Sequence, residues 1–332
     1  MKTVLVTGGA GFVGKHLVSH LVSEGARVRV LDLRSPDTMD GVDWIVGSVT
    51  DHDPDLWRRC LDGVDTVYHL AGIADLWRPD EGAFEAVNVG GTETVLEAAV
   101  RTNVRRFVQC SSLTTLVSRD APIGHSRADE KVVLPPSDLL GPYPASKRAA
   151  DLLVLEAAEA GLNASIAMPT EPIGAGDTSL TPPTRMILDF ANGQTPAFID
   201  CVLNFVPVED LARGFVAVGE SGRNGERYLL GGENVSMSEL LSTLDGLVSR
   251  AMPKTRLPFA VAYAAGVLDT HLVARLTQKP PKAPLTGVRL AGRQVSFSSE
   301  KAKRDLRWEA GPFAPALRNL LDWAKSHGHL KD

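Results

Sequence analysis

The chain is poor in cysteine, with 3 Cys among 332 residues, at Cys60, Cys110 and Cys201. An odd number without C-x-x-C spacing argues against a disulfide framework and against a zinc site. We therefore expect no metal and a reducing compartment, the cytoplasm. The first residues, MKTVLVTGGAGF, also lack the apolar stretch and cleavage site of a signal peptide, which agrees with that expectation.

Charge of one sign is also scarce. The sequence has 35 Lys and Arg against 40 Asp and Glu, a formal net charge of -5, and the charges are interspersed. Without a basic stripe, nucleic acid is not an expected partner. The hydrophobic share of 44% is near the globular average and excludes a disordered or collagen-like chain. A folded protein with a small-molecule substrate is the expectation that remains.

Uninterrupted hydrophobic runs are short. The most apolar late segment, Pro258–Leu276, is broken by Asp269 and His271. It is too short to cross a bilayer, so we expect no membrane span and interpret it as a buried helix or a lid over the substrate. The basic residues beside it, such as Arg275 and Lys279, leave an interfacial membrane helix as the less favoured alternative.

The first half of the chain alternates apolar runs of strand length with helical patterns. Runs such as Val4–Val6, Val28–Leu31 and Phe107–Cys110 lack clean alternation, which is typical of strands covered on both faces. Strand–helix–strand alternation predicts an α/β fold, a Rossmann-type doubly wound parallel sheet. We place a nucleotide-binding domain at 1–168 and a smaller C-terminal substrate-binding lobe at 169–332, with some segments of that lobe returning to the sheet.

A glycine-rich loop follows the first predicted strand. Gly8, Gly11 and Gly14 form a G-x-x-G-x-x-G run with Phe12 and Val13, and this run opens a predicted helix. Glycines permit a tight turn, close approach of the backbone to a pyrophosphate and close packing of helix on sheet. The helix N-terminus supplies free N–H groups and the positive end of a dipole. Strand before and helix after make this a dinucleotide-binding motif.

The second predicted strand ends at Asp32, about twenty residues beyond the loop. A carboxylate at this position accepts hydrogen bonds from the adenosine ribose hydroxyls, which favours NAD. Arg34 offers the alternative of pairing with the 2′-phosphate of NADP. Because Asp32 would repel that phosphate, we predict NAD and interpret Arg34 as a surface charge, with NADP as the alternative.

Tyr143 and Lys147 are four residues apart in a predicted helix, so their side chains share one face. A free phenol, with a pKa of about 10, is a poor acid–base catalyst at neutral pH. A nearby ammonium and the positive ring of an oxidised nicotinamide would lower that value. Ser112, or Ser111 if the strand ends one residue earlier, would orient the oxygen of the substrate for proton transfer.

Taken together, these segments resemble the extended short-chain dehydrogenase/reductase superfamily, also known as the NAD-dependent epimerase/dehydratase family. The matching stretches, in order, are TGGAGFVG, LDL, YHLAG, NVGGTETVLEAA, FVQCSS, YPASK, MPTEPIGAGD, FVPVEDLARG and SEKAKRDLRW. Within it the sequence is most similar to the hopanoid-associated sugar epimerases, and it also resembles dihydroflavonol-reductase-like and 3β-hydroxysteroid-dehydrogenase-like enzymes.

The resemblance implies roles for single residues. Tyr143 would be the general acid/base, Lys147 would hold the nicotinamide ribose and lower the pKa of Tyr143, and Ser112 would bind the substrate oxygen. The further cofactor-binding positions that we expect, beside the glycine loop, Asp32 and Arg34, are Val49, Leu70, Ala71, Gly72 and Pro169. Candidate substrate-binding residues are Trp77, Asn88 and Glu171. For Asn88 a helix cap, for Glu171 a solvated or backbone-bonded carboxylate, and for Trp77 loop packing are the alternatives.

Two reactions fit this set of residues. In one, a single hydride transfer interconverts a secondary alcohol and a ketone. In the other, bound NAD transiently oxidises a nucleotide-linked sugar and returns the hydride, giving epimerisation. The segments LTTLVS and VRLAGRQVSF depart from the sugar-nucleotide pattern, and Leu113-Thr114 offers no carboxylate for dehydration. We therefore favour the oxidoreductase, with a catalytically inert nucleotide-sensing protein least favoured.

The family resemblance also suggests a homodimer that pairs through the helices at Asn88–Thr102 and Tyr143–Ala160. The alternative is that the apolar faces of these two helices simply cover the sheet.

Overall fold

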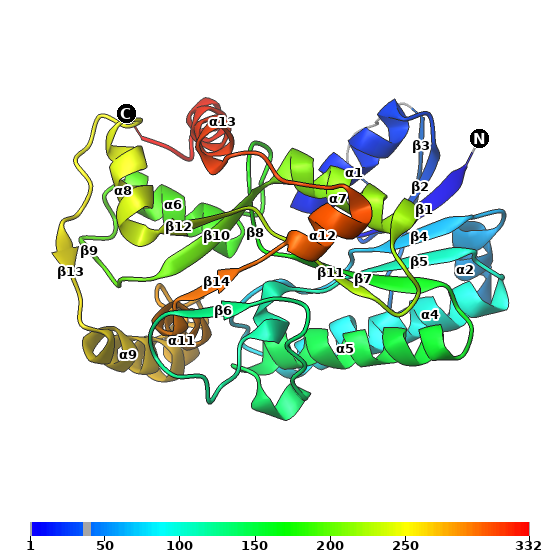
Figure 1. The fold of residues 1–332 in the computed structure, drawn as a ribbon, viewed down its shortest axis with the longest axis horizontal. Coiled ribbons are helices and arrows are strands. Elements are labelled where there is room, and N and C mark those ends of the chain that lie inside the picture. The colour runs from blue at the N-terminus through cyan, green and yellow to red at the C-terminus, as the bar shows by residue number, and fades with distance from the viewer. Residues whose placement is uncertain (1, 36–40, 332) are drawn as a thin grey trace.

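A computed structural model describes residues 2–35 and 41–331. Its centre is a seven-stranded sheet in which every neighbouring pair runs parallel (Figure 1). In spatial order the strands are β11 (Arg227–Leu230), β7 (Ala164–Pro169), β5 (Arg106–Cys110), β4 (Thr66–His69), β1 (Thr3–Thr7), β2 (Arg27–Asp32) and β3 (Val42–Val46). This order confirms the predicted doubly wound α/β fold, because the chain proceeds from β1 first to one edge and then to the other.

Helices cover both faces of the sheet, as its apolar strands require. One face packs α2 (Pro54–Leu61), α4 (Gly91–Arg101) and α5 (Pro142–Glu159), and the other packs α1 (Phe12–Ser23), α7 (Val208–Ser221) and α12 (Glu300–Leu306). Two separate apolar cores result. The first surrounds Trp57, Phe107 and Val154, and the second surrounds Tyr68, Phe215 and Trp308.

Short elements precede α4 and α5. They are α3 (Gly82–Phe84), the π-helical turn η1 (Glu85–Gly90), the 3-10 turns η2 (Leu113–Leu116) and η3 (Pro136–Asp138), and β6 (Ser126–Ala128). The chain passes from α3 through η1 into α4 without leaving the helical conformation. Asn88 lies inside this continuous helix, so it does not cap a helix that follows it.

The C-terminal half builds a second, smaller layer beside the sheet. Its parts are β8 (Glu171–Ile173), α6 (Pro182–Ala191), β9 (Ala197–Phe198), β10 (Val202–Pro207), β12 (Glu233–Ser236), α8 (Met237–Asp245), β13 (Thr255–Arg256), β14 (Val295–Phe297) and α13 (Phe313–Ser326). β10 lies between β8 and β12, and α6, α8 and α13 pack a third core around Phe205, Leu240 and Leu317. The helix expected at 313–326 is confirmed.

The two halves share elements. β7 ends at Pro169, across the expected boundary, and β11 of the later half forms the edge of the large sheet. In the opposite direction, β6 of the first half pairs with β14. The division into a cofactor domain and a substrate lobe stays a prediction.

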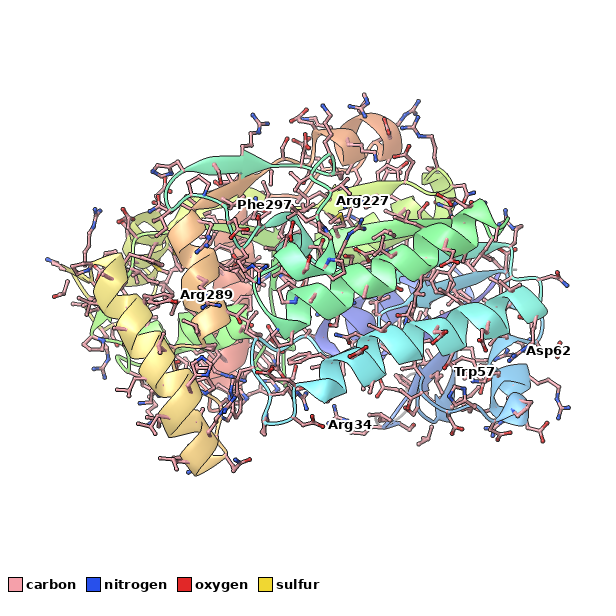
Figure 2. The ribbon with its side chains drawn as sticks, turned by 90° about the horizontal axis from the view of Figure 1, so that it is seen from below. Arg34, Trp57, Asp62, Arg227, Arg289 and Phe297 are labelled. Carbon is pink, nitrogen blue, oxygen red and sulfur yellow. The ribbon has the colours of Figure 1, made fainter. Side chains whose placement is uncertain are left out.

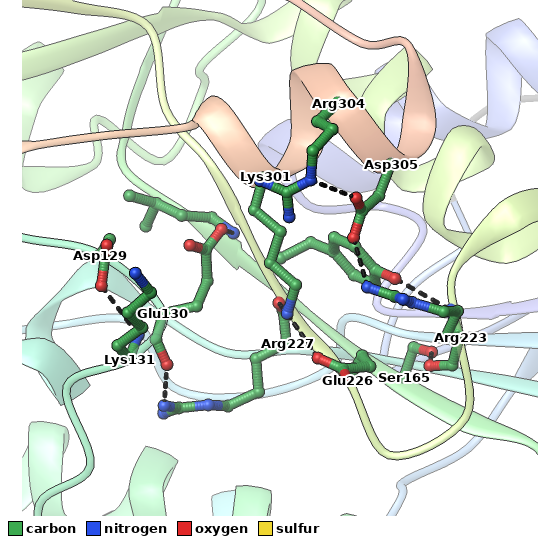
Figure 3. A network of polar contacts seen from close by, with 12 residues as sticks. Asp129, Glu130, Lys131, Ser165, Arg223, Glu226, Arg227, Lys301, Arg304 and Asp305 are labelled. Carbon is green, nitrogen blue, oxygen red and sulfur yellow. Dashed lines mark hydrogen bonds and ion pairs between the residues drawn. The ribbon is translucent and has the colours of Figure 1, made fainter.

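A polar network fastens β11 to its surroundings (Figure 3). The Lys301 ammonium of α12 lies 2.6 Å from the Glu226 carboxylate, donates to the Arg227 carbonyl and sits 4.6 Å from the centre of the Tyr228 ring. On the other side, the backbone N–H of Leu229 donates to the Glu130 carboxylate at 2.6 Å. The last strand of the sheet is thus held by a helix and a loop from opposite ends of the chain.

One expectation about the fold is wrong. The segment interpreted as a buried helix or lid forms α9 (Phe259–Leu268), η4 (Asp269–Val273) and α10 (Ala274–Thr277), and most of its residues are exposed. It packs along α11 (Leu285–Arg293) through Ala262 and Gly266, at the edge of the molecule (Figure 2). The periodic pattern predicted the helix, but hydrophobicity alone did not predict which side would be covered.

The network around Lys301 makes a prediction about stability. Lys301→Met should lower the free energy of unfolding by about 1–2 kcal/mol at pH 7, because Glu226 and the Arg227 carbonyl lose a charged partner. The Lys301 hydrogen bond holds the pKa of Glu226 below its usual value, so its contribution is present above the unfolded pKa and disappears as the pH falls. Urea unfolding at pH 7 and pH 3.5 should show the difference between wild type and variant narrowing in acid.

The matched control is Lys303→Met, whose ion pair with Glu309 is exposed on both sides. It should change stability little at either pH. Equal losses in both variants would mean that Lys301 does not fasten β11.

Candidate active site

The glycine loop lies between β1 and α1 and is as tight as the motif requires. Gly8 has φ +73°, and a Cβ there would lie 2.7 Å from the backbone nitrogen of Ala71. A Cβ on Gly14 would lie 2.2 Å from the Gly8 carbonyl oxygen. Gly11 begins α1 without a side-chain cap, so the first N–H groups of the helix point into an open cradle at its positive end.

Two predicted residues next to this cradle differ in exposure. Phe12 is buried and meets the His16 ring edge to face at 5.6 Å, while Val13 is partly buried. His16 in turn reaches the Ala175 carbonyl at 3.0 Å. The start of α1 is thereby tied to the segment that follows β8.

Asp32 sits at the end of β2 and faces the same loop. Its carboxylate accepts the backbone N–H of Ala10 at 3.0 Å and that of Arg34 at 3.2 Å. Both bonds orient the carboxylate at the carboxyl edge of the sheet, beside the cradle. The Arg34 side chain is exposed, and Val49, a further predicted position, is buried against Gly91.

The turn after β4 joins the cradle to the second group of predicted residues. The N–H groups of Leu70 and Ala71 donate to the backbone and side chain of Thr7, at 3.1 and 3.2 Å. Next to them, a Cβ on Gly72 would lie 2.8 Å from the Asn88 side-chain oxygen and 3.8 Å from the Lys147 ammonium. Residues 70–72 therefore touch both the glycine loop and the helix that carries Lys147.

Asn88 is almost fully buried and works as a bridge. Its side chain accepts the N–H of Ile73 at 2.7 Å and donates to the Ile73 carbonyl at 3.1 Å and to the Ser146 hydroxyl at 2.9 Å. Ser146 lies next to Lys147 in α5. This π-helical turn, an element that often marks functional sites, fixes the turn after β4 against α5.

Tyr143 and Lys147 lie in the first turns of α5 and are both buried. The Tyr143 ring packs on Phe84 at 6.1 Å, and the Lys147 ammonium donates to the carbonyl of Cys110, the last residue of β5. Ser112, two residues beyond Cys110, caps the turn η2 and accepts the Thr114 N–H at 3.2 Å. Because β5 ends where α5 begins, the structure brings the three residues of the predicted trio together.

Burial raises the pKa of Tyr143 above its ordinary value, with a hydrogen bond to the Ser112 hydroxyl acting in the opposite direction. In the free chain the phenol therefore holds its proton at neutral pH. The lowering of this pKa that we expect from Lys147 and an oxidised nicotinamide stays a prediction about the complex.

Sequence reasoning missed a buried carboxylate next to this trio. Asp151 follows Lys147 by one helical turn and accepts the Ser111 hydroxyl at 2.6 Å, which explains where the second serine of the pair is engaged. Burial raises the pKa of Asp151 to about 6, against the nearby positive charges of Lys147 and Arg148. The signal was available, because Tyr143, Lys147 and Asp151 continue the same i, i+4 spacing.

His69, at the end of β4, was also missed. Its ring lies between the hydroxyls of Thr7 at 2.7 Å and Thr92 at 3.1 Å, and burial lowers its pKa to about 3. The imidazole is therefore neutral, and it links β1 to α4 behind the turn of residues 70–72.

Pro169 and Glu171 lie where β7 passes into β8. Glu171 accepts the backbone N–H of Asn204 at 3.1 Å, and burial raises its pKa to about 8, so it is largely protonated at neutral pH. Trp77 lies partly buried in the segment between β4 and α3, two residues beyond Asp75, whose charge acts on Tyr143. Contact of Trp77, Asn88 or Glu171 with a substrate stays a prediction.

These observations fit a dinucleotide. The cradle would be filled by a Cβ at Gly8 or Gly14, the N-terminal N–H groups of α1 suit a pyrophosphate, and Asp32 suits ribose hydroxyls. Tyr143 and Lys147 lie across residues 70–72 from this cradle, on the same edge of the sheet.

Comparisons with known proteins agree with this geometry. Residues 4–231 match the NAD dependent epimerase/dehydratase family. A protein of Synechocystis sp. named "Putative dihydroflavonol 4-reductase" is 32% identical over 98% of this chain and 95% of its own. The 4-hydroxy-2-methyl-3-oxo-4-farnesyl-3,4-dihydroquinoline-1-oxide ketoreductase of Stigmatella aurantiaca is 31% identical over 92% and 91%. The crystal structure of gox2253 superimposes with a TM-score of 0.83, at 31% identity and full coverage of both chains.

The chain thus belongs to the NAD-dependent epimerase/dehydratase family, the extended branch of the short-chain dehydrogenases/reductases. It is an NAD-dependent enzyme with a Rossmann-type sheet.

Gly14→Ala tests the cradle directly. A methyl group 2.2 Å from the Gly8 carbonyl must displace the loop, so NADH affinity should fall by at least about a hundredfold. Titration by nicotinamide fluorescence measures it. The control is Gly90→Ala, a helical glycine with open space around its Cβ position, which should bind NADH like the wild type. Unchanged binding by Gly14→Ala would place the cofactor elsewhere.

Glu171→Gln tests the buried carboxyl. A pKa raised to about 8 means that folding favours the protonated form, so wild-type stability is lost as the pH rises from the unfolded pKa through about 8. Chemical unfolding should therefore show the variant gaining stability relative to the wild type between pH 6 and pH 9. A constant difference across this range would contradict the burial of an uncompensated carboxyl.

Proposed function

We propose that the protein interconverts a ketone and a secondary alcohol with NAD(H), and that Tyr143 is the general acid/base. The observation that carries the proposal is the joining of two sites at one sheet edge. Gly72 lies within contact distance of Asn88 and Lys147, while its neighbour Ala71 packs on Gly8 of the nucleotide cradle. When bound, the dinucleotide supplies the hydride that a carbonyl carbon accepts.

The state of Tyr143 suits the reductive direction. Reduction of a ketone creates negative charge on oxygen, which a buried phenol that keeps its proton can neutralise. Ser112, held by the turn η2 close to Tyr143, orients the same oxygen. Lys147, fixed by the Cys110 carbonyl, presents its charge to the ribose and to the phenolate that forms.

The named relatives favour a substrate with a large apolar part. The names of both curated relatives describe reductases, and one of them acts on a farnesyl-bearing ring ketone. We infer that this chain reduces a ring ketone of comparable apolar character.

Epimerisation of a nucleotide-linked sugar is the alternative that the family name keeps open. The two reactions differ in what they do to the cofactor. A reductase consumes NADH in proportion to product, whereas an epimerase returns the hydride and leaves the NADH concentration unchanged. Absorbance at the nicotinamide band, followed with a dihydroflavonol and separately with UDP-glucose, distinguishes them.

Tyr143→Phe removes the acidic hydroxyl and keeps the ring that packs on Phe84. Turnover of the ketone found in this screen should fall by about 10²–10⁴, while NADH affinity should stay within about threefold of the wild type, since uniform binding is not removed. Turnover at the wild-type rate would exclude Tyr143 as the proton donor.

A homodimer through α4 and α5 remains part of the proposal. Val100 and Leu152 are large aliphatic side chains exposed on these two helices, which the pairing would cover.

A further inference from the structure

The helix α9–α10 carries large apolar side chains on the outside of the molecule. We call the residues Val261, Leu268, Leu272, Val273 and Leu276 the outer stripe; they are 53%, 57%, 50%, 44% and 77% exposed. Val261, Leu268, Leu272 and Leu276 recur at the spacing of one helix face. In a soluble helix such residues face the core, so their exposure requires an explanation.

The inward face of the same helix holds small residues. Ala262, Gly266 and Ala274 are buried, and a Cβ on Gly266 would lie 3.2 Å from the Val288 side chain of α11. The Phe259 ring fits equally closely over Gly292 of α11. The helix is therefore firmly seated on α11, and the outer stripe is a rigid surface of the folded protein.

Charge is distributed unevenly along this segment. Between residues 257 and 282 the single acidic residue is Asp269, and its carboxylate is turned inward, where it accepts the Ala283 N–H at 3.0 Å. Arg275 and Lys279 are exposed beside the end of the stripe, and no ion pair engages either of them within the described ranges 2–35 and 41–331. Lys282 follows, also exposed.

We propose that α9–α10 docks on the surface of an anionic lipid bilayer, with the outer stripe among the acyl chains and Arg275 and Lys279 against the headgroups. An apolar helix face bordered by basic residues is the arrangement that binds in the plane of such an interface. The charges favour anionic lipid, because each basic residue near a negative surface strengthens binding.

The same residues argue against the other occupants. The helix of 19 residues, Phe259–Thr277, is long and apolar enough to be a candidate span, but it contains Asp269, His271 and Arg275 and keeps one face on α11. A second copy laid on the stripe would bring its own Arg275 and Lys279, with the one acidic residue of the segment already engaged. Neither occupant matches both the apolar stripe and the unpaired positive charge.

The docking helix is connected to the candidate site. On its inner side lies a cavity of about 370 Å³ lined by Phe259 and Tyr263 of α9, by Arg289 of α11 and by Leu140, two residues before α5 begins. α11 also meets Gly141, next to that start, through Thr286. A membrane-docked enzyme would thus present its site to apolar molecules dissolved in the bilayer, a consequence that rests on the proposed function, whereas docking itself does not.

The test is vesicle flotation of the full chain. With vesicles of phosphatidylcholine and phosphatidylglycerol the protein should float, and binding should weaken with added salt and on pure phosphatidylcholine. Leu268→Glu combined with Leu272→Glu should weaken binding by at least about a hundredfold. Arg275→Gln combined with Lys279→Gln should weaken it by about fivefold for each basic residue removed.

Matched controls separate docking from general stickiness. Val46→Glu combined with Val133→Glu alters two other exposed aliphatic residues, and Arg58→Gln combined with Arg59→Gln removes two exposed arginines of α2. Both should float like the wild type, and NADH titration verifies the fold of every variant without requiring turnover.

Three results would overturn the proposal. Wild-type protein that stays with the aqueous phase means that no bilayer is bound. A mass doubling in vesicle-free solution that the leucine variant abolishes identifies a second copy as the occupant. Release by detergent alone, with resistance to high salt and alkaline carbonate, identifies a spanning helix.

Discussion

The close approach of the β1–α1 loop to the turn after β4 is the contact on which the rest of the site depends. Gly8 meets the backbone of Ala71 with no room for a side chain, and Thr7 holds residues 70 and 71 through its carbonyl and hydroxyl. From that turn the buried side chain of Asn88 reaches Ser146. One chain of contacts therefore runs from the nucleotide cradle to the helix of Tyr143 and Lys147, and it sets the span that a bound dinucleotide must match.

The sheet topology explains why these contacts are possible. Parallel strands place their carboxyl ends on one edge, so the residues that follow β1, β2, β4 and β5 gather there although they are far apart in the sequence. The C-terminal half closes the arrangement by contributing β11, which Lys301 and Glu130 hold from two sides. The fold thereby couples the stability of the sheet to both ends of the chain.

The sequence predicted what local spacing determines. Glycines at 8, 11 and 14 imposed the turn, and apolar runs such as Val4–Val6 predicted covered parallel strands. The same i, i+4 rule that paired Tyr143 with Lys147 would have reached Asp151, whose importance comes from burial beside Ser111, a contact across 40 residues. Burial is a tertiary property, and for the same reason the apolar segment at 258–276 was assigned to the core. Its hydrophobicity is real, but small residues face α11 and the large ones face outward.

The most direct test of the account is the structure of the protein with NAD bound. We predict the adenosine ribose on Asp32, the pyrophosphate at the N-terminus of α1 and the nicotinamide ribose within hydrogen-bonding distance of Tyr143 and Lys147. A nicotinamide that lies away from Tyr143, with Asp32 free of the ribose, would contradict the single continuous site from which the proposed chemistry follows.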